Sequence, residues 1–323
     1  MAAKEKPTQK PTTHEGERIA KVLSRAGVAS RREAERMIEI GDVAVNGKVI
    51  TSPALNVTSA DRITVNGRPI AAAEPPRLWL YYKPDGLVTS TSDEKGRPTV
   101  FDNLPDDMPR VMSIGRLDLN SEGLLLLTND GGLKRRLELP STGWLRKYRV
   151  RVNGNPTDPD LEPLRRGITV DGDAFQPMTV VLDRHQGANA WLTVGIREGK
   201  NREIRRAMTA IDLSVNRLIR TGYGPFRLGD LEPGQVEEVR PRVLADQLGS
   251  GATDDTAVAK PKAVVRSRKP QLAEGEGLTQ LSREWQAATA KPGTGKPGSA
   301  NPAGANPGAT RTKPAAKPPR RGE

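Results

Sequence analysis

The residue best placed to do chemistry is an aspartate just upstream of a buried strand. Asp118 lies in a polar loop, residues 114–121, that leads directly into four consecutive leucines, residues 124–127. This run is too short for a helix and apolar on both faces, so it predicts a strand buried on both sides. Loops held by such a scaffold often carry reactive side chains. An isolated loop aspartate is also a common turn or cap residue, so its position alone leaves both interpretations open.

A tyrosine lies on the apolar face of a second expected strand. Within residues 144–152, alternation places Arg146, Tyr148, Val150 and Val152 on one face. The phenol of Tyr148 could stack on a base and exchange a proton with it. The alternative is that its ring simply fills the core.

Arginines accompany an expected helix that follows a third strand, residues 191–196, and a turn, residues 198–201. The apolar face of this helix consists of Ile204, Ala207, Met208 and Ile211. Arg202, Arg205 and Arg206 have the spacing i, i+3, i+4, which predicts a separate basic stripe. Taken alone, such a stripe is usually a solvated face.

The composition restricts the possible chemistry. The chain has no cysteine and two histidines, His14 and His185, which excludes disulfides, cysteine zinc sites and thiol nucleophiles and argues against a histidine triad or a multi-histidine metal centre. Catalysis must therefore come from Asp, Glu, Tyr, Lys or Arg. There is no apolar run long enough to span a membrane and no apolar core of a secretory signal. We expect a cytoplasmic protein with no metal and no membrane partner.

The charge distribution defines the expected domains. The formal net charge is +12, and residues 251–323 hold 13 Lys/Arg against 6 Asp/Glu with a single aromatic, Trp285. Such a segment buries too little apolar surface to offset its ordering entropy, which predicts a disordered basic tail rich in Pro, Gly and Ala over residues 249–323 and a shorter one over residues 1–16. Two domains remain, residues 17–75 and residues 77–248. The positive excess predicts a polyanionic partner.

The first domain is expected to hold two short helices followed by two hairpins. Ser30 with Glu33 forms a capping box, Gly41 ends the second helix, and Asn46-Gly47 and Asn66-Gly67 are typical hairpin turns. The outward faces of the two helices carry the basic residues Arg18, Lys21, Arg25, Arg31, Arg32 and Arg36. Basic side chains on two consecutive helices favour phosphate binding over a merely solvated surface.

The stretch GVASRREAERMIEIGDVAVNGKVI, residues 27–50, closely resembles the S4 RNA-binding domain, and the resemblance extends from residue 17 to about residue 73. It implies binding to structured RNA by shape and backbone.

Three further strings resemble the ribosomal RNA pseudouridine synthases of the RsuA/RluB type. They are GRLDLNSEGLLLLTNDG at residues 115–131, KYRV at residues 147–150 and REGKNREIRRAM at residues 197–208. The resemblance implies that Asp118 is the essential carboxylate, that Tyr148 lies against the target base, and that Arg205 pairs with Asp118. Arg116, Lys147, Lys200 and Arg202 are expected RNA contacts.

The implied reaction breaks the C1′–N1 bond of uridine, turns the base and joins C1′ to C5. No atom is gained or lost, so no cofactor is expected. Whether Asp118 attacks the sugar, attacks the ring or abstracts a sugar proton stays open at this point.

The same residues argue against other functions. A methyltransferase would need a Gly-rich turn after a first strand, and a zinc deaminase would need His and Cys ligands; the chain has neither. A non-catalytic ribosome-assembly factor would not require Asp118, Tyr148 and Arg205 together. We therefore predict an α+β enzyme, monomeric, with a mixed, mostly antiparallel sheet and flanking helices in its catalytic domain. Its expected substrate is 23S large-subunit ribosomal RNA, as for RluB, with 16S small-subunit RNA, as for RsuA, as the alternative.

Overall fold

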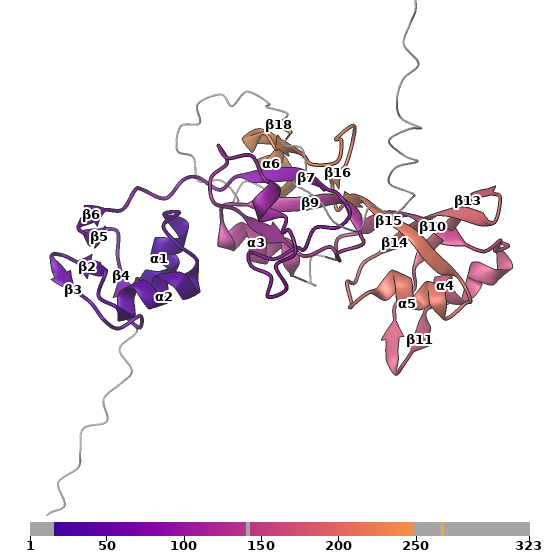
Figure 1. Ribbon diagram of the computed structural model, residues 1–323, viewed down its shortest axis with the longest axis horizontal. Helices are drawn as coiled ribbons and strands as arrows, with labels where there is room; N and C mark the ends of the chain where they lie inside the picture. Colours follow the sequence, from indigo (N-terminus) through magenta and orange to yellow (C-terminus); the bar gives the residue numbers. More distant parts are fainter. Residues whose placement is uncertain (1–15, 140–142, 249–265, 268–323) are drawn as a thin grey trace, which may run out of the picture. The chain divides into compact units, whose positions relative to one another are not determined.

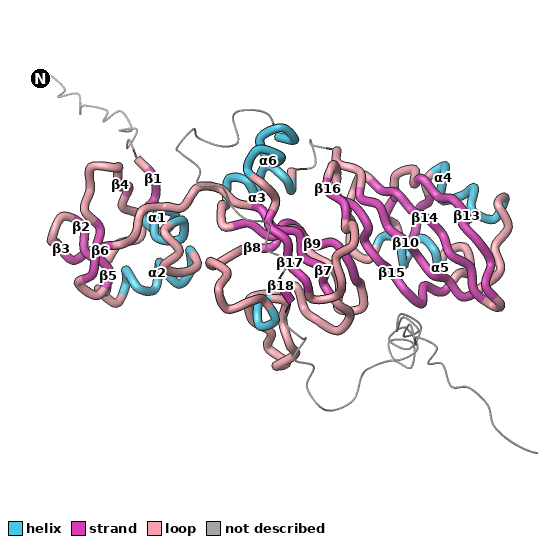
Figure 2. The backbone as a smooth tube through the Cα atoms, turned by 90° about the horizontal axis from the view of Figure 1, so that it is seen from above, coloured by secondary structure: helices cyan, strands magenta, loops and turns pink. Residues whose placement is uncertain are grey.

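The computed structural model describes residues 16–139, 143–248 and 266–267. Apart from Gly16 and Arg266–Ser267, the two expected tails lie outside these ranges. The described residues form a small helix-and-hairpin part and a larger part built on one wide sheet (Figures 1 and 2). No helix within these ranges is long and apolar enough to cross a membrane.

The small part begins with helices whose ends are set by local signals. Strand β1 (Glu17–Arg18) leads into α1 (Ile19–Arg25), and α2 (Arg31–Glu39) follows. The Ser30 hydroxyl accepts a hydrogen bond from the backbone N–H of Glu33 at 3.1 Å, which confirms the predicted N-cap. After α2 the chain turns at Gly41, whose φ of +86° lies in the region that favours glycine.

Two tight hairpins complete this part. Strands β2 (Val43–Val45), β3 (Lys48–Val49), β5 (Ile63–Val65) and β6 (Arg68–Pro69) form a sheet in the order β3-β2-β5-β6, while β4 (Asn56–Val57) pairs with β1. Asn46 and Asn66 have φ values of +51° and +49°, as the predicted asparagine-glycine turns require. The helices and hairpins share one hydrophobic cluster that includes Ile19, Leu23, Ala34, Ile38, Val43 and Ile63.

The larger part is organised around a ten-stranded sheet. Its strands are β7 (Leu78–Lys83), β8 (Met112–Ile114), β9 (Glu122–Thr128), β10 (Arg146–Asn153), β13 (Thr179–Gln186), β14 (Asn189–Ile196), β15 (Ser214–Tyr223), β16 (Phe226–Arg227), β17 (Gln235–Glu238) and β18 (Arg266–Ser267). The order is β13-β14-β10-β15-β9-β7-β17-β18, with β16 on β15 and β8 on β9. Within the described ranges, the pairing of β9 with β15 is parallel and the other strand pairs of this sheet are antiparallel. The predicted mixed, mostly antiparallel α+β architecture is confirmed.

Helices flank this sheet, and a separate two-stranded hairpin completes the larger part. The helical segments are η1 (Phe101–Asn103), α3 (Gly131–Glu138), η3 (Pro159–Leu161), α4 (Glu162–Arg166), α5 (Glu203–Thr209) and α6 (Pro241–Leu248). Strands β11 (Ile168–Val170) and β12 (Asp173–Phe175) form the hairpin.

The four leucines of β9 are fully buried, as predicted, because each face of the sheet is covered. Leu124 and Leu126 belong to a cluster that contains side chains of α3 and α6. Leu125 and Leu127 belong to the other cluster, which contains Tyr148 and residues of α5. This double packing fixes β9, and with it the start of the strand where the Asp118 loop ends.

Candidate active site

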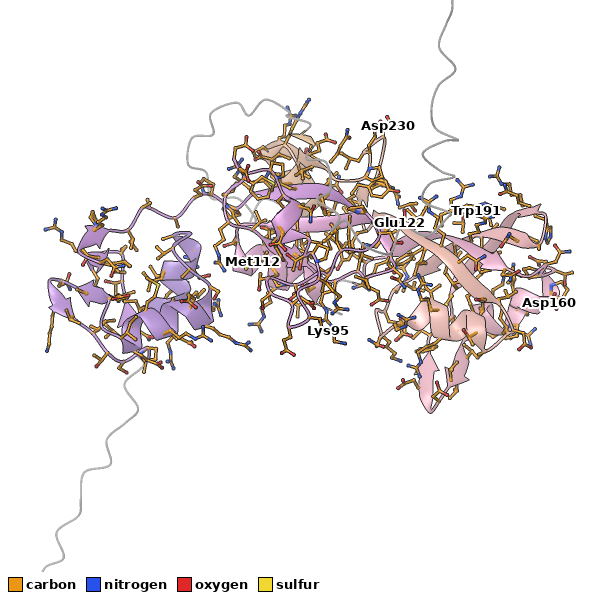
Figure 3. All side chains as sticks on the ribbon, viewed as in Figure 1. Lys95, Met112, Glu122, Asp160, Trp191 and Asp230 are labelled. Atoms are coloured by element: carbon orange, nitrogen blue, oxygen red, sulfur yellow. The ribbon has the colours of Figure 1, made fainter. Side chains whose placement is uncertain are left out.

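The loop that carries Asp118 is held through its backbone carbonyls. The carbonyl of Leu117 accepts a hydrogen bond from the Thr89 hydroxyl at 2.8 Å. After Asp118, the carbonyl of Asn120 accepts one from Arg205 at 2.6 Å, and that of Ser121 accepts one from Lys83 at 2.8 Å. Glu122, labelled in Figure 3, then begins β9. Side chains from separate elements thus fix the backbone on both sides of Asp118.

Lys83 holds the Asp118 loop from inside the protein. It is the last residue of β7 and its side chain is fully buried. Its ammonium donates to the carbonyls of Ser121, Leu119 and Pro84 at 2.8, 3.2 and 3.1 Å. Burial lowers the pKa of Lys83 to about 8 although the nearby carboxylates of Asp85, Glu122 and Asp118 favour the charged form. Strand alternation explains this burial, because Lys83 shares one strand face with the buried residues Trp79 and Tyr81.

We expect Lys83→Met to lower the free energy of unfolding by about 1–3 kcal/mol, because buried carbonyls lose their donor. RNA affinity should not change, since the fully buried side chain cannot reach RNA. Urea unfolding and filter binding on both proteins check this. Equal stability of the two proteins would mean that the free energy lost by burying the ammonium equals the free energy gained from its hydrogen bonds.

The stability difference between wild type and Lys83→Met should also depend on pH. The folded protein releases the Lys83 proton near pH 8, whereas the unfolded chain keeps it up to the ordinary pKa of 10.5. The unfolded state therefore binds more protons in this window, and the wild type should gain stability relative to the variant as pH rises from about 8 to 10.5. Unfolding curves at several pH values in this range test the sign.

The expected ion pair between Arg205 and Asp118 is absent from the part of the chain that the structure describes. Arg205 instead donates to the carbonyls of Asn120 at 2.6 Å and Val215 at 2.9 Å. Burial lowers the pKa of Arg205, while the charges of Asp118 and Asp85 act in the opposite direction. Arg205 thus holds the loop by its backbone, two residues beyond the carboxylate.

The predicted stripe of three arginines is also corrected. Arg202 precedes α5 with a left-handed backbone, φ +48°, so it does not continue the helix face of Arg205. Arg206 points to the β11–β12 hairpin, where it pairs with Asp173 at 2.6 Å and Asp171 at 3.4 Å. The three side chains therefore have three different surroundings.

A cavity of about 330 Å³ opens beside the Asp118 loop. It is lined by Gly115, Arg116, Leu117, Asp118, Ser121, Glu138, Arg146, Tyr148, Ile196, Gly199, Lys200, Asn201, Arg202, Glu203, Ile204, Leu218, Arg220 and Tyr223. Asp118 and Tyr148 thus meet in one cavity, together with the expected RNA contacts Arg116, Lys200 and Arg202. Arg205 and Lys147 do not line it. The charge of Lys200 is partly compensated within the protein, because its ammonium forms an ion pair with Glu198 at 3.1 Å.

The wall also contains functional candidates that the sequence did not single out, namely Arg146, Glu203, Arg220 and Tyr223. Arg146 lies over the Tyr223 ring, with its guanidinium carbon 5.1 Å from the ring centroid. Burial, reinforced by the charge of Glu198, raises the pKa of Glu203 to about 7. Two of these residues could have been identified from the sequence by their charge: Arg220 lies within an apolar strand, and Glu203 lies at the start of an amphipathic helix. In the described ranges, no group of three or more acidic or histidine side chains could hold a metal ion.

The basic residues of the first two helices differ in their surroundings. Lys21 and Arg25 both pair with Glu17, at 2.5 and 2.9 Å. Arg36 pairs with Glu33 at 3.2 Å, and this pair is exposed. The side chains of Arg18, Arg31 and Arg32 lie at the surface. Arg31 and Arg32 on α2 are therefore surface arginines that no ion pair in the described ranges includes.

Residues 77–210 match the family described as RNA pseudouridylate synthase, and residues 17–63 match the S4 domain. An uncharacterized RNA pseudouridine synthase of Rickettsia bellii is 49% identical over 223 residues, 69% of this chain and 96% of that protein. Ribosomal large subunit pseudouridine synthase B of Salmonella typhi is 42% identical over 218 residues, 66% of this chain and 75% of that protein. A crystal structure of a pseudouridylate synthase superposes with a TM-score of 0.52 at 23% identity, covering 72% of this chain and all of that one.

Proposed function

The chain belongs to the RNA pseudouridylate synthase family and is a pseudouridine synthase, and we propose that it isomerises one uridine of large-subunit ribosomal RNA. The observation that carries the proposal is that Asp118 and Tyr148 line the same cavity. The large subunit is favoured because three similar relatives, from Salmonella typhi, Salmonella typhimurium and Yersinia pestis, are named ribosomal large subunit pseudouridine synthase B. We further propose that the enzyme acts as a cytoplasmic monomer.

The geometry supports distinct roles for the proposed site residues. Asp118 presents a carboxylate at the cavity from a loop whose backbone is fixed on both sides. A preorganised group of this kind spends little free energy on reorganisation during the reaction. Tyr148, 8% exposed, offers its ring for stacking on the target base and its hydroxyl to take or relay the C5 proton. Arg205 is a positioning residue, because it contacts the Asp118 loop and not the cavity.

The substrate is tested by mapping pseudouridines in ribosomal RNA from wild-type and deletion cells with carbodiimide modification and primer extension. We expect one stop in large-subunit RNA to disappear and to return on complementation with the wild-type gene. Loss of a stop in small-subunit RNA would replace the proposed substrate. Unchanged maps of both RNAs would refute a ribosomal substrate.

We expect reversal of charge at Arg31, Arg32 and Arg36 together to lower activity on the cognate RNA much more than affinity for unrelated RNA. These side chains extend from the capped helix α2 at fixed spacing, so they can match the backbone of one folded RNA. A pseudouridine assay and salt titrations with cognate and scrambled RNA measure both effects.

A matched control reverses three charges on the hairpins of the same part, at Lys48, Arg62 and Arg68, which are also exposed. It should weaken binding to both RNAs similarly. Deletion of residues 251–323 should do the same and leave the modified site unchanged, because the 13 Lys/Arg against 6 Asp/Glu of this segment add mainly sequence-independent attraction. Loss of discrimination in either control, with discrimination intact in the α2 variant, would contradict this division of roles.

A further inference from the structure

Arg220 is a buried cation in the wall of the cavity. Its side chain belongs to β15, is 2% exposed, and donates from Nε to the carbonyl of Leu124 at 2.7 Å. Its Nη2 is buried without a hydrogen-bond partner. The ion pairs found in the described ranges do not include it. Arginine stays charged in proteins, and an unpaired buried charge is costly, so the fold alone does not account for this residue.

The strand register places Arg220 beside the proposed reacting groups. Arg220 lies directly opposite Tyr148 on β10 and opposite Gly123 on β9. Cross-strand partners project to the same face, so the side chains of Arg220 and Tyr148 leave the sheet on one side. A Cβ at Gly123 would lie 2.4 Å from the carbonyl oxygen of Arg220, so this close approach of β9 and β15 requires glycine. Arg220, Tyr148 and Asp118 all line the same cavity.

The neighbours of Arg220 do not use all of its hydrogen-bonding capacity. Its guanidinium carbon lies 5.3 Å from the centroid of the Tyr223 ring, a cation–π contact that consumes no N–H donor. Lys83 is a second buried cation nearby, and the charge of Arg220 contributes to lowering the Lys83 pKa. Arg220 is therefore a buried cation in the cavity wall with an unused donor, and such a group can stabilise negative charge that develops nearby.

We propose that Arg220 is a further catalytic residue, whose guanidinium donates to a carbonyl oxygen of the target uracil and stabilises the negative charge that develops on the ring. This inference rests on the proposed function, because it needs a uridine in the cavity. When C1′–N1 breaks, the electron pair stays on the base and is shared by O2 and O4. C5 then attacks C1′, the C5 proton leaves, and N1 takes up a proton. A charge-assisted hydrogen bond strengthens as this charge develops.

Arg220→Gln and Arg220→Lys test the proposal on an RNA fragment that contains the target uridine. For Arg220→Gln we expect kcat to fall by about 10²–10³-fold, the scale seen when one oxyanion donor is removed, with little change in KM. Arg220→Lys keeps a charge and should retain part of the rate. Thermal unfolding and RNA affinity are measured alongside, and Arg217→Lys is the matched control. Arg217 lies on the same strand, pairs with Glu122 at 2.8 Å and does not line the cavity.

The decisive substrates carry 2-thiouridine or 4-thiouridine at the target, because sulfur is a weak hydrogen-bond acceptor. Sulfur at the oxygen that accepts from Arg220 should lower the rate of the wild type and of Arg217→Lys. The same substitution should lower the rate of Arg220→Gln much less, because that variant has already lost the hydrogen bond and coupled changes are not additive. Full thio effects at both positions in Arg220→Gln would overturn the inference. A raised KM with a smaller salt slope would overturn it too, by making Arg220 a phosphate contact. If the wild type modified no ribosomal fragment, the proposed function itself would fail, whereas wild-type kinetics in Arg220→Gln would refute only this inference.

Discussion

Asp118→Asn is expected to abolish pseudouridine formation while RNA affinity stays largely unchanged. Asparagine keeps the size and the hydrogen-bonding atoms of the side chain but removes the negative charge that each mechanism open to this site requires. The loss should be on the order of 10⁴-fold or more, as when a nucleophile is removed from other enzymes. Single-turnover assays on a ribosomal fragment, with filter binding in parallel, measure the two quantities separately.

Asp130→Asn is the matched control for this prediction. Asp130 follows the other end of β9, where its carboxylate accepts a hydrogen bond from the backbone N–H of Leu133 at 2.6 Å and caps α3. Asparagine is an equally good cap, so stability and activity should change little. Turnover by Asp118→Asn close to that of Asp130→Asn would show that Asp118 is not the catalytic group.

The elements set by local signals could be predicted from the sequence. The Ser30 cap and the Asn46 and Asn66 turns depend on residues within three positions of one another, and the structure contains all of them. The strand of residues 124–127 was equally predictable, because four leucines in succession require apolar partners on both faces. The S4 and pseudouridine synthase motifs also predicted the order of the two domains along the chain.

Features that depend on how distant segments meet could not be predicted in the same way. Arg205 reaches the carbonyl of Asn120 and not the carboxylate of Asp118 because the path of that loop is set by Thr89 and Lys83, more than 25 residues upstream. The placement of Arg220 follows from the register of β15 on β10 and β9, which nothing within β15 specifies. Sequence periodicity gives the face of a residue, whereas its partner comes from the tertiary fold.

A comparison of Tyr148→Phe with Tyr148→Leu should separate the two roles proposed for the tyrosine. Phenylalanine keeps a ring that can stack on the base, so RNA affinity should persist, but it can neither take nor relay the C5 proton. Turnover should fall by about 10²–10⁴-fold, the usual contribution of a general acid or base. Leucine removes the ring as well and should also weaken capture of the target uridine.

A kinetic isotope effect at C5 decides whether impaired transfer of the C5 proton causes the fall in turnover of Tyr148→Phe. With uridine deuterated at C5, a Phe variant that has lost its base should show a primary isotope effect, because deprotonation becomes rate-limiting. Tyr81→Phe serves as the control, since Tyr81 is a fully buried strand tyrosine of the same cluster, its hydroxyl is buried without a hydrogen-bond partner, and it does not line the cavity. It should keep wild-type kinetics and stability. If Tyr148→Phe lost turnover without any isotope effect, the hydroxyl would act elsewhere in the reaction, and the C5 proton would leave by another route.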